Sequence, residues 1–81
     1  MTTLDSLQPG ARARLVTIGG ERGFRRRMLE LGLLPGTEIR VVRRADVGRL
    51  IEVEVGGGFL SVRRTEADRI EVAQTRQGVE E

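Results

Sequence analysis

The stretch 24–37 restricts the fold of this chain more than any other, because its residues predict a short helix followed by two glycine corners and a strand. Phe24, Met28 and Leu31 fall at i, i+4 and i+7, so they line one stripe of an amphipathic helix. Gly32 is suited to end that helix, since glycine adopts the left-handed conformation that follows a C-cap. The chain is therefore expected to leave the helix at a sharp corner.

A second corner follows at Pro35 and Gly36. Proline presets φ at position i+1 of a turn and glycine accepts positive φ at i+2, so this pair predicts a type II turn. Pro9–Gly10 predicts a similar corner earlier in the chain. Gly56–Gly58 predicts a hairpin connection, and a phosphate loop is disfavoured because its glycines would open a helix, whereas a β pattern follows here.

Alternating apolar residues between the corners predict five short strands, at residues 11–18, 37–44, 51–55, 59–63 and 69–72. The apolar phase of the first strand changes between Leu15 and Val16, which indicates a bulge or a strand covered on both faces. Leu4 and Leu7 are spaced to pin a lead-in turn to the body, and Thr65 is expected to be the N-cap of a single helical turn. Because so short a sheet must curl to enclose a core, the pattern indicates a mainly β chain: a small, partly open antiparallel barrel of about five strands with one α-helix inserted after the first.

The 81 residues allow one small domain, expected at 1–73 and followed by a mobile polar tail at 74–81. The chain has no cysteine, histidine, lysine or tyrosine, so the usual nucleophiles and general bases are missing, as are all nitrogen and sulfur metal ligands except two methionine thioethers. We therefore expect no enzyme activity, no cofactor and no metal site. No apolar run approaches the roughly 18 residues of a membrane span, and the N-terminus lacks a signal-peptide pattern, so the expected location is the cytoplasm.

Arginine supplies all 14 positive charges, and 12 acidic residues leave a net charge of +2. Four of these arginines gather at positions 22, 25, 26 and 27. Consecutive helical residues point about 100° apart, so three arginines in a row form no flat patch, although Arg22 and Arg26 share a face. A solvated helix face explains the cluster most simply, and docking to an acidic partner or to phosphate is the functional alternative.

So small a domain cannot bury every apolar residue of the helix and the corner that follows it. Leu29 lies about 100° from Met28 around the helix, so an apolar edge is expected to stay exposed in a groove between helix and barrel. The candidate partner-binding residues are Arg25, Met28, Leu29, Leu31, Gly32, Leu33, Pro35 and Gly36.

The sequence resembles the ferrous iron transport protein A (FeoA) family. The resemblance runs from Leu4 to Val72, and its most specific part is the segment 27–37, Arg-Met-Leu-Glu-Leu-Gly-Leu-Leu-Pro-Gly-Thr. Supporting positions are Leu4, Leu7, Pro9, Gly10, Val62, Arg63, Ala67, Ile70 and Val72. The chain departs from many relatives at the loop 44–49, Arg-Ala-Asp-Val-Gly-Arg, which contains no proline.

This resemblance implies an SH3-like barrel and a small cytosolic partner of FeoB, a membrane ferrous iron transporter with a cytoplasmic GTPase domain. The leading hypothesis is a non-catalytic accessory protein that docks on the cytoplasmic part of such a transporter and is peripheral to the membrane only through that partner. The runner-up is a nucleic-acid-binding or iron-regulatory barrel that uses the four arginines. It would need aromatic stacking platforms, for which only Phe24 and Phe59 are available. A third hypothesis is a homo-oligomer formed through the same apolar edge.

Overall fold

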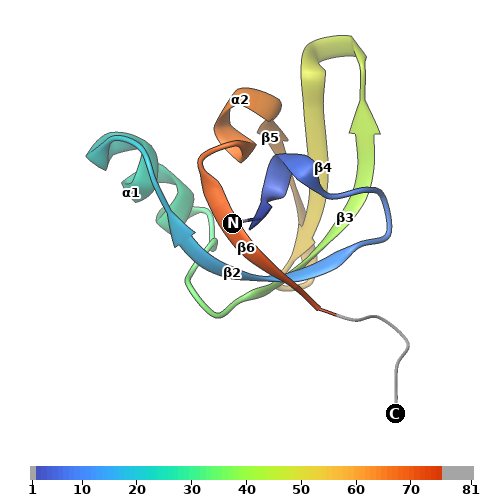
Figure 1. Ribbon diagram of the computed structural model, residues 1–81. Coiled ribbons are helices and arrows are strands. Elements are labelled where there is room, and N and C mark those ends of the chain that lie inside the picture. The colour runs from blue at the N-terminus through green and yellow to red at the C-terminus, as the bar shows by residue number, and fades with distance from the viewer. Residues whose placement is uncertain (1, 76–81) are drawn as a thin grey trace.

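A curled antiparallel sheet forms the body of the molecule in the computed structural model, which describes residues 2–75 (Figure 1). Its strands lie in the order β1-β6-β2-β3-β4-β5, and every neighbouring pair is antiparallel. The elements, in chain order, are β1 (Thr2–Thr3), η1 (Leu4–Ser6), β2 (Arg12–Ile18), α1 (Arg22–Glu30), β3 (Glu38–Ala45), η2 (Val47–Arg49), β4 (Leu50–Val55), β5 (Gly58–Arg63), α2 (Arg64–Ala67) and β6 (Ile70–Thr75). The expected mainly β fold with one helix between its first long strands is confirmed.

All five expected strands are present, as β2 to β6, with ends that differ by no more than three residues from the prediction. The sequence pattern missed β1, whose two residues pair with β6 at Thr2↔Val72 and Thr3↔Glu71. It also ended the last strand too early, because β6 pairs with β2 as far as Thr75↔Arg12. Gln74 and Thr75, expected in the tail, therefore belong to the sheet, and the rest of the expected tail, 76–81, lies outside the described residues.

The phase change in β2 is a bulge at Val16. The pairing of β2 with β6 shifts register between Leu15 and Thr17, so one extra residue sits on the β2 side. A bulge of this kind moves the following side chains to the opposite face. As a result Leu15 and Ile18 are both buried although they are three residues apart, and Val16 is exposed.

The corner after α1 is a Schellman motif, in which Gly32 has φ 99° as expected. The amide of Leu33 donates to the carbonyl of Met28 over 3.0 Å, and the amide of Gly32 donates to that of Leu29 over 3.0 Å. The next corner is the predicted turn: Thr37 N–H donates to the Leu34 carbonyl over 3.0 Å. Both corners therefore form as the local sequence indicates.

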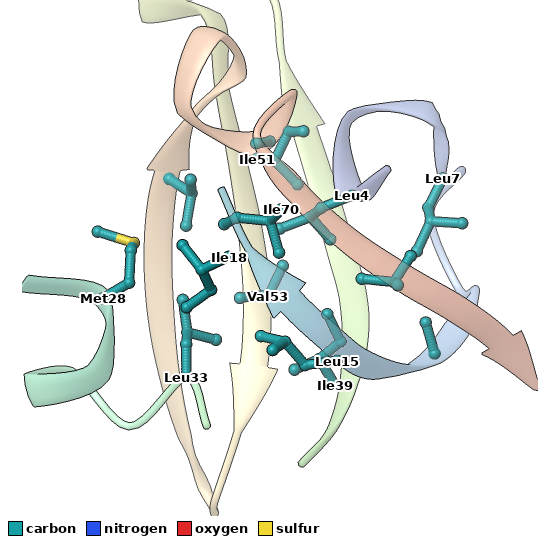
Figure 2. Packing of buried hydrophobic residues seen from close by; sticks show 14 of the residues in the cluster. Leu4, Leu7, Leu15, Ile18, Met28, Leu33, Ile39, Ile51, Val53 and Ile70 are labelled. Atoms are coloured by element: carbon teal, nitrogen blue, oxygen red, sulfur yellow. The ribbon is translucent and has the colours of Figure 1, made fainter. Parts of the chain in front are cut away.

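The core fills the space enclosed by the curled sheet, η1, α1 and α2 (Figure 2). Leu4 and Leu7 are buried, which confirms that the lead-in turn is pinned to the body. The other buried apolar residues are Ala13, Leu15, Ile18, Phe24, Met28, Leu33, Ile39, Val41, Ile51, Val53, Val62, Ala67, Ile70 and Val72. No polar or charged residue within 2–75 is buried, so this core is apolar and polar groups stay at its surface.

The prediction for the second helix was wrong by two residues at its start. Its N-cap is Arg63, the last residue of β5, rather than Thr65. The amide of Arg63 donates to Oε1 of Glu66 over 3.2 Å, so a carboxylate from the first turn satisfies a backbone donor at the helix start. The strand thus runs directly into α2 and leaves Thr65 inside the helix.

Candidate functional site

Helix α1 packs on the barrel through Phe24 and Met28, which are both buried. They are four residues apart, so they lie one turn above the other on the same face of the helix. The guanidinium groups of Arg27 and Arg69 each lie 5.8 Å from the centre of the Phe24 ring, one from the helix and one from the loop before β6. The face of α1 that carries Phe24 and Met28 is therefore covered, and its other faces remain open.

A groove of about 370 Å³ opens along the other side of α1. We call it the α1 groove, and its lining residues are Thr17, Ile18, Arg22, Arg25, Arg26, Leu29 and Pro35. The four residues from α1 are spaced i, i+3, i+4 and i+7, so they form one continuous stripe of the helix. This spacing could have been found from the sequence. It was missed because the arginines were considered as a run of three consecutive residues.

The Pro35 wall of the α1 groove is attached to β2 by two backbone hydrogen bonds. Gly36 N–H donates to the Leu15 carbonyl over 2.7 Å, and Leu15 N–H donates to the Thr37 carbonyl over 2.9 Å. Arg14 adds a side-chain bond from Nη1 to the Gly36 carbonyl over 3.1 Å. Helix, turn and strand therefore hold the groove in a fixed shape.

Three of the candidate residues, Arg25, Leu29 and Pro35, meet in the α1 groove. Leu31, Gly32 and Gly36 are exposed but lie outside its lining. Leu34, which is not among the candidate residues, is 50% exposed and so adds to the apolar surface of the corner.

The placement of Met28 and Leu33 on the exposed edge was wrong, because Met28 is 2% and Leu33 0% exposed. Met28 is buried because it shares a face of α1 with Phe24, and Leu33 is buried because the Schellman motif brings the residue after Gly32 back against the last full turn of the helix. Figure 2 shows Leu33 among the core side chains and Met28 on the helix side of the same cluster. Leu31, at the C-cap between them, stays 48% exposed.

The arginines around the α1 groove differ in their ion pairs. Nε of Arg26 lies 3.4 Å from Oε2 of Glu30 in an exposed i, i+4 ion pair. Arg22 and Arg25 have no carboxylate within 4.0 Å among residues 2–75. Arg27, on another face of the helix, pairs with Glu66 of α2 and takes no part in the groove.

The two phenylalanines provide no stacking platform beside these arginines. Phe24 is buried under the helix, and Phe59 is 64% exposed on β5, where its strand neighbour is Glu54 of β4. Within residues 2–75, no three His, Cys, Asp or Glu side chains gather closely enough to hold a metal ion. No helix in the same range has the length and apolar character needed to cross a bilayer.

Comparison with known proteins shows the relationships of the chain. Residues 2–74 match the FeoA domain family. The FeoA protein of Chlorobium tepidum, a solution NMR structure, is 37% identical, with a TM-score of 0.86 over 93% of this chain and 71% of that one. FeoA of Stenotrophomonas maltophilia, a prokaryotic SH3 domain protein crystallised with zinc, is 29% identical, with a TM-score of 0.79 over 96% and 100% of the two chains. A manganese-dependent transcriptional repressor has a TM-score of 0.86 over 91% of this chain and 36% of its own, but at 18% identity it shares the fold alone. No match was found among curated proteins.

A curled antiparallel sheet with a helix inserted after β2, and an open groove on that helix, define a small SH3-like domain protein. The family match extends over nearly all of the described chain. The chain belongs to the FeoA family, as its sequence resemblance predicts.

Proposed function

We propose that this protein is a non-catalytic, cytoplasmic accessory protein of ferrous iron transport that docks on the cytoplasmic part of a FeoB-type transporter. Membership of the FeoA family supports the transport context. The observation that carries the docking role is the exposure of three large apolar side chains near the C-terminal end of α1 and in the corner after it: Leu29, Leu31 and Leu34 are 42%, 48% and 50% exposed. Large apolar side chains exposed together on a small domain are typical of a protein contact.

The rigidity of this surface favours the same role. Leu31 is the C-cap of α1, and Leu34 is held by the turn bond from Thr37, so both are fixed by backbone hydrogen bonds. A contact surface that is ordered before binding loses less conformational entropy when the partner arrives. This surface has the character of a preformed docking site.

The test is a titration of the purified chain against the cytoplasmic domains of the transporter. Leu29→Gln should weaken binding about tenfold or more, because a central apolar contact contributes more than 1 kcal/mol. Val47→Gln is the matched control, since Val47 is an exposed apolar residue on η2. Equal binding by the two variants would contradict the site, and undiminished iron uptake in a strain without the protein would contradict the function.

A further inference from the structure

We propose that the α1 groove receives a partner segment in which carboxylate side chains flank an apolar side chain. This inference rests on the docking function proposed above and names the chemistry of the partner. The groove combines two kinds of surface. Ile18, Leu29 and Pro35 provide an apolar lining, and Arg22, Arg25 and Arg26 stand along the helix beside it.

The helix places these arginines where they are electrostatically unfavourable. Arg22 and Arg25 lie in the first turns of the nine-residue α1, and there is no acidic residue in the first turn of that helix. Cations at a helix N-terminus are disfavoured by the helix dipole. Glu21 is the N-cap of the helix, but neither arginine forms an ion pair within 4.0 Å with a carboxylate of residues 2–75. A carboxylate from a partner would relieve this repulsion.

Arginine also fits a carboxylate by shape. The planar guanidinium offers parallel N–H donors to both oxygens, which gives shorter and stronger bonds than a neutral pair. Arg22 and Arg26 are one helical turn apart, with Arg25 beside them on the same stripe, so more than one carboxylate can be met along the groove. The apolar lining between helix and β2 then takes the side chain between those carboxylates.

The hollow shape favours a peptide segment over the two other anionic partners. A groove of about 370 Å³ can enclose a side chain, whereas a bilayer surface is broad and would leave the hollow unfilled. Free phosphate would use the arginines but not the lining of Ile18, Leu29 and Pro35. A segment with both carboxylate and apolar groups uses the whole groove.

The experiment is an NMR titration with the acetylated, amidated peptide Glu-Glu-Leu-Glu-Glu as the probe. Amide shifts should be confined to α1, the end of β2 and the Pro35 turn. The peptides Gln-Gln-Leu-Gln-Gln and Glu-Glu-Ser-Glu-Glu, which lack the charge and the apolar group respectively, should each bind about tenfold more weakly. Added salt should weaken binding of the glutamate peptide and leave the glutamine peptide unchanged.

A matched pair of double variants tests the arginines. Arg22→Gln with Arg25→Gln should reduce affinity for the probe about tenfold. Arg12→Gln with Arg43→Gln removes the same net charge from β2 and β3 and should leave the affinity for the probe unchanged. All four side chains are exposed, so both proteins should fold, and circular dichroism verifies this.

Three outcomes would overturn the inference. One is equal binding of the glutamate and glutamine peptides, and another is an equal loss of affinity in both double variants. The third is sedimentation of the chain with vesicles of phosphatidylglycerol and phosphatidylcholine while the peptide causes no shifts, which would assign the arginines to a membrane surface. The same variants distinguish a failure of this inference from a failure of the docking function. If Leu29→Gln weakens transporter binding and the Arg22 and Arg25 double variant does not, docking stands and the acidic partner is wrong. If the peptide binds and the transporter domains do not, the acidic ligand of the α1 groove stands and docking on the transporter is wrong.

Discussion

The amide of Gly36 donates a hydrogen bond to the carbonyl of Leu15 over 2.7 Å, which joins the turn after α1 to the strand before it. Pro35 stands next to that bond and forms one wall of the α1 groove. The groove therefore depends on a backbone contact between segments on either side of the helix, and changes to this turn should affect both stability and the proposed docking.

Gly36→Ala is expected to destabilise the fold by about 1–2 kcal/mol. Gly36 has φ 90°, and no atom lies within 4 Å of the position that a Cβ would take, so the cost is conformational and not steric. Gly23→Ala is the control, since Gly23 is helical and equally free of contacts, and it should stabilise the protein by about 0.5–1 kcal/mol. Urea denaturation of the two variants measures both effects, and a loss of similar size in each would contradict the explanation.

Met28→Ala should cost about 2–5 kcal/mol in the free energy of unfolding, because it removes a buried side chain and leaves a cavity. Leu29→Ala, at the next residue, should cost less than about 1 kcal/mol, since Leu29 is already 42% exposed and its loss leaves no enclosed cavity. Thermal denaturation of both variants decides which residue the core requires. If Leu29 proved the more costly of the two, the orientation of α1 described above would be wrong.

Arg44→Met should destabilise the chain by about 1–3 kcal/mol. Nη1 of Arg44 donates to the carbonyls of Asp5 and Leu7 over 2.7 and 2.9 Å, so this side chain ties the lead-in turn to β3. Arg43→Met should change stability by no more than about 0.5 kcal/mol, because Arg43 makes only an exposed ion pair with Glu52. Hydrogen exchange at the Leu7 amide should rise in the first variant alone, and protection unchanged from the parent chain would refute the role of Arg44.

The ion pair between Arg27 of α1 and Glu66 of α2 should show a coupling energy below about 1 kcal/mol in a double-mutant cycle. Arg27 is more than half exposed, so water screens the pair, and added salt should reduce the coupling further. The cycle uses Arg27→Gln, Glu66→Gln and the double variant. A coupling that is large and insensitive to salt would show that the two helices depend on this contact.

Local sequence determined the elements whose conformation is decided within a few residues. Gly32 and the pair Pro35 and Gly36 form the expected corners because each needs a positive φ that glycine alone adopts readily. The hairpin after β4 forms for the same reason, since Gly56 and Gly57 have φ 59° and 85°. The bulge at Val16 was also visible, as a break in the alternation of apolar residues.

Only the tertiary structure decided which apolar residues are buried. Met28 and Leu31 lie on one stripe in the sequence, yet the Schellman motif returns Leu33 to the core and leaves Leu31 outside. Strand β1 is too short to carry a pattern and exists because β6 is there to pair with it. The α1 groove likewise requires Ile18 and Pro35 to meet, and they come together only through the hydrogen bonds between the turn and β2. The sequence by itself thus specified the helix, the corners and the family, whereas the α1 groove depends on contacts between residues far apart in the chain.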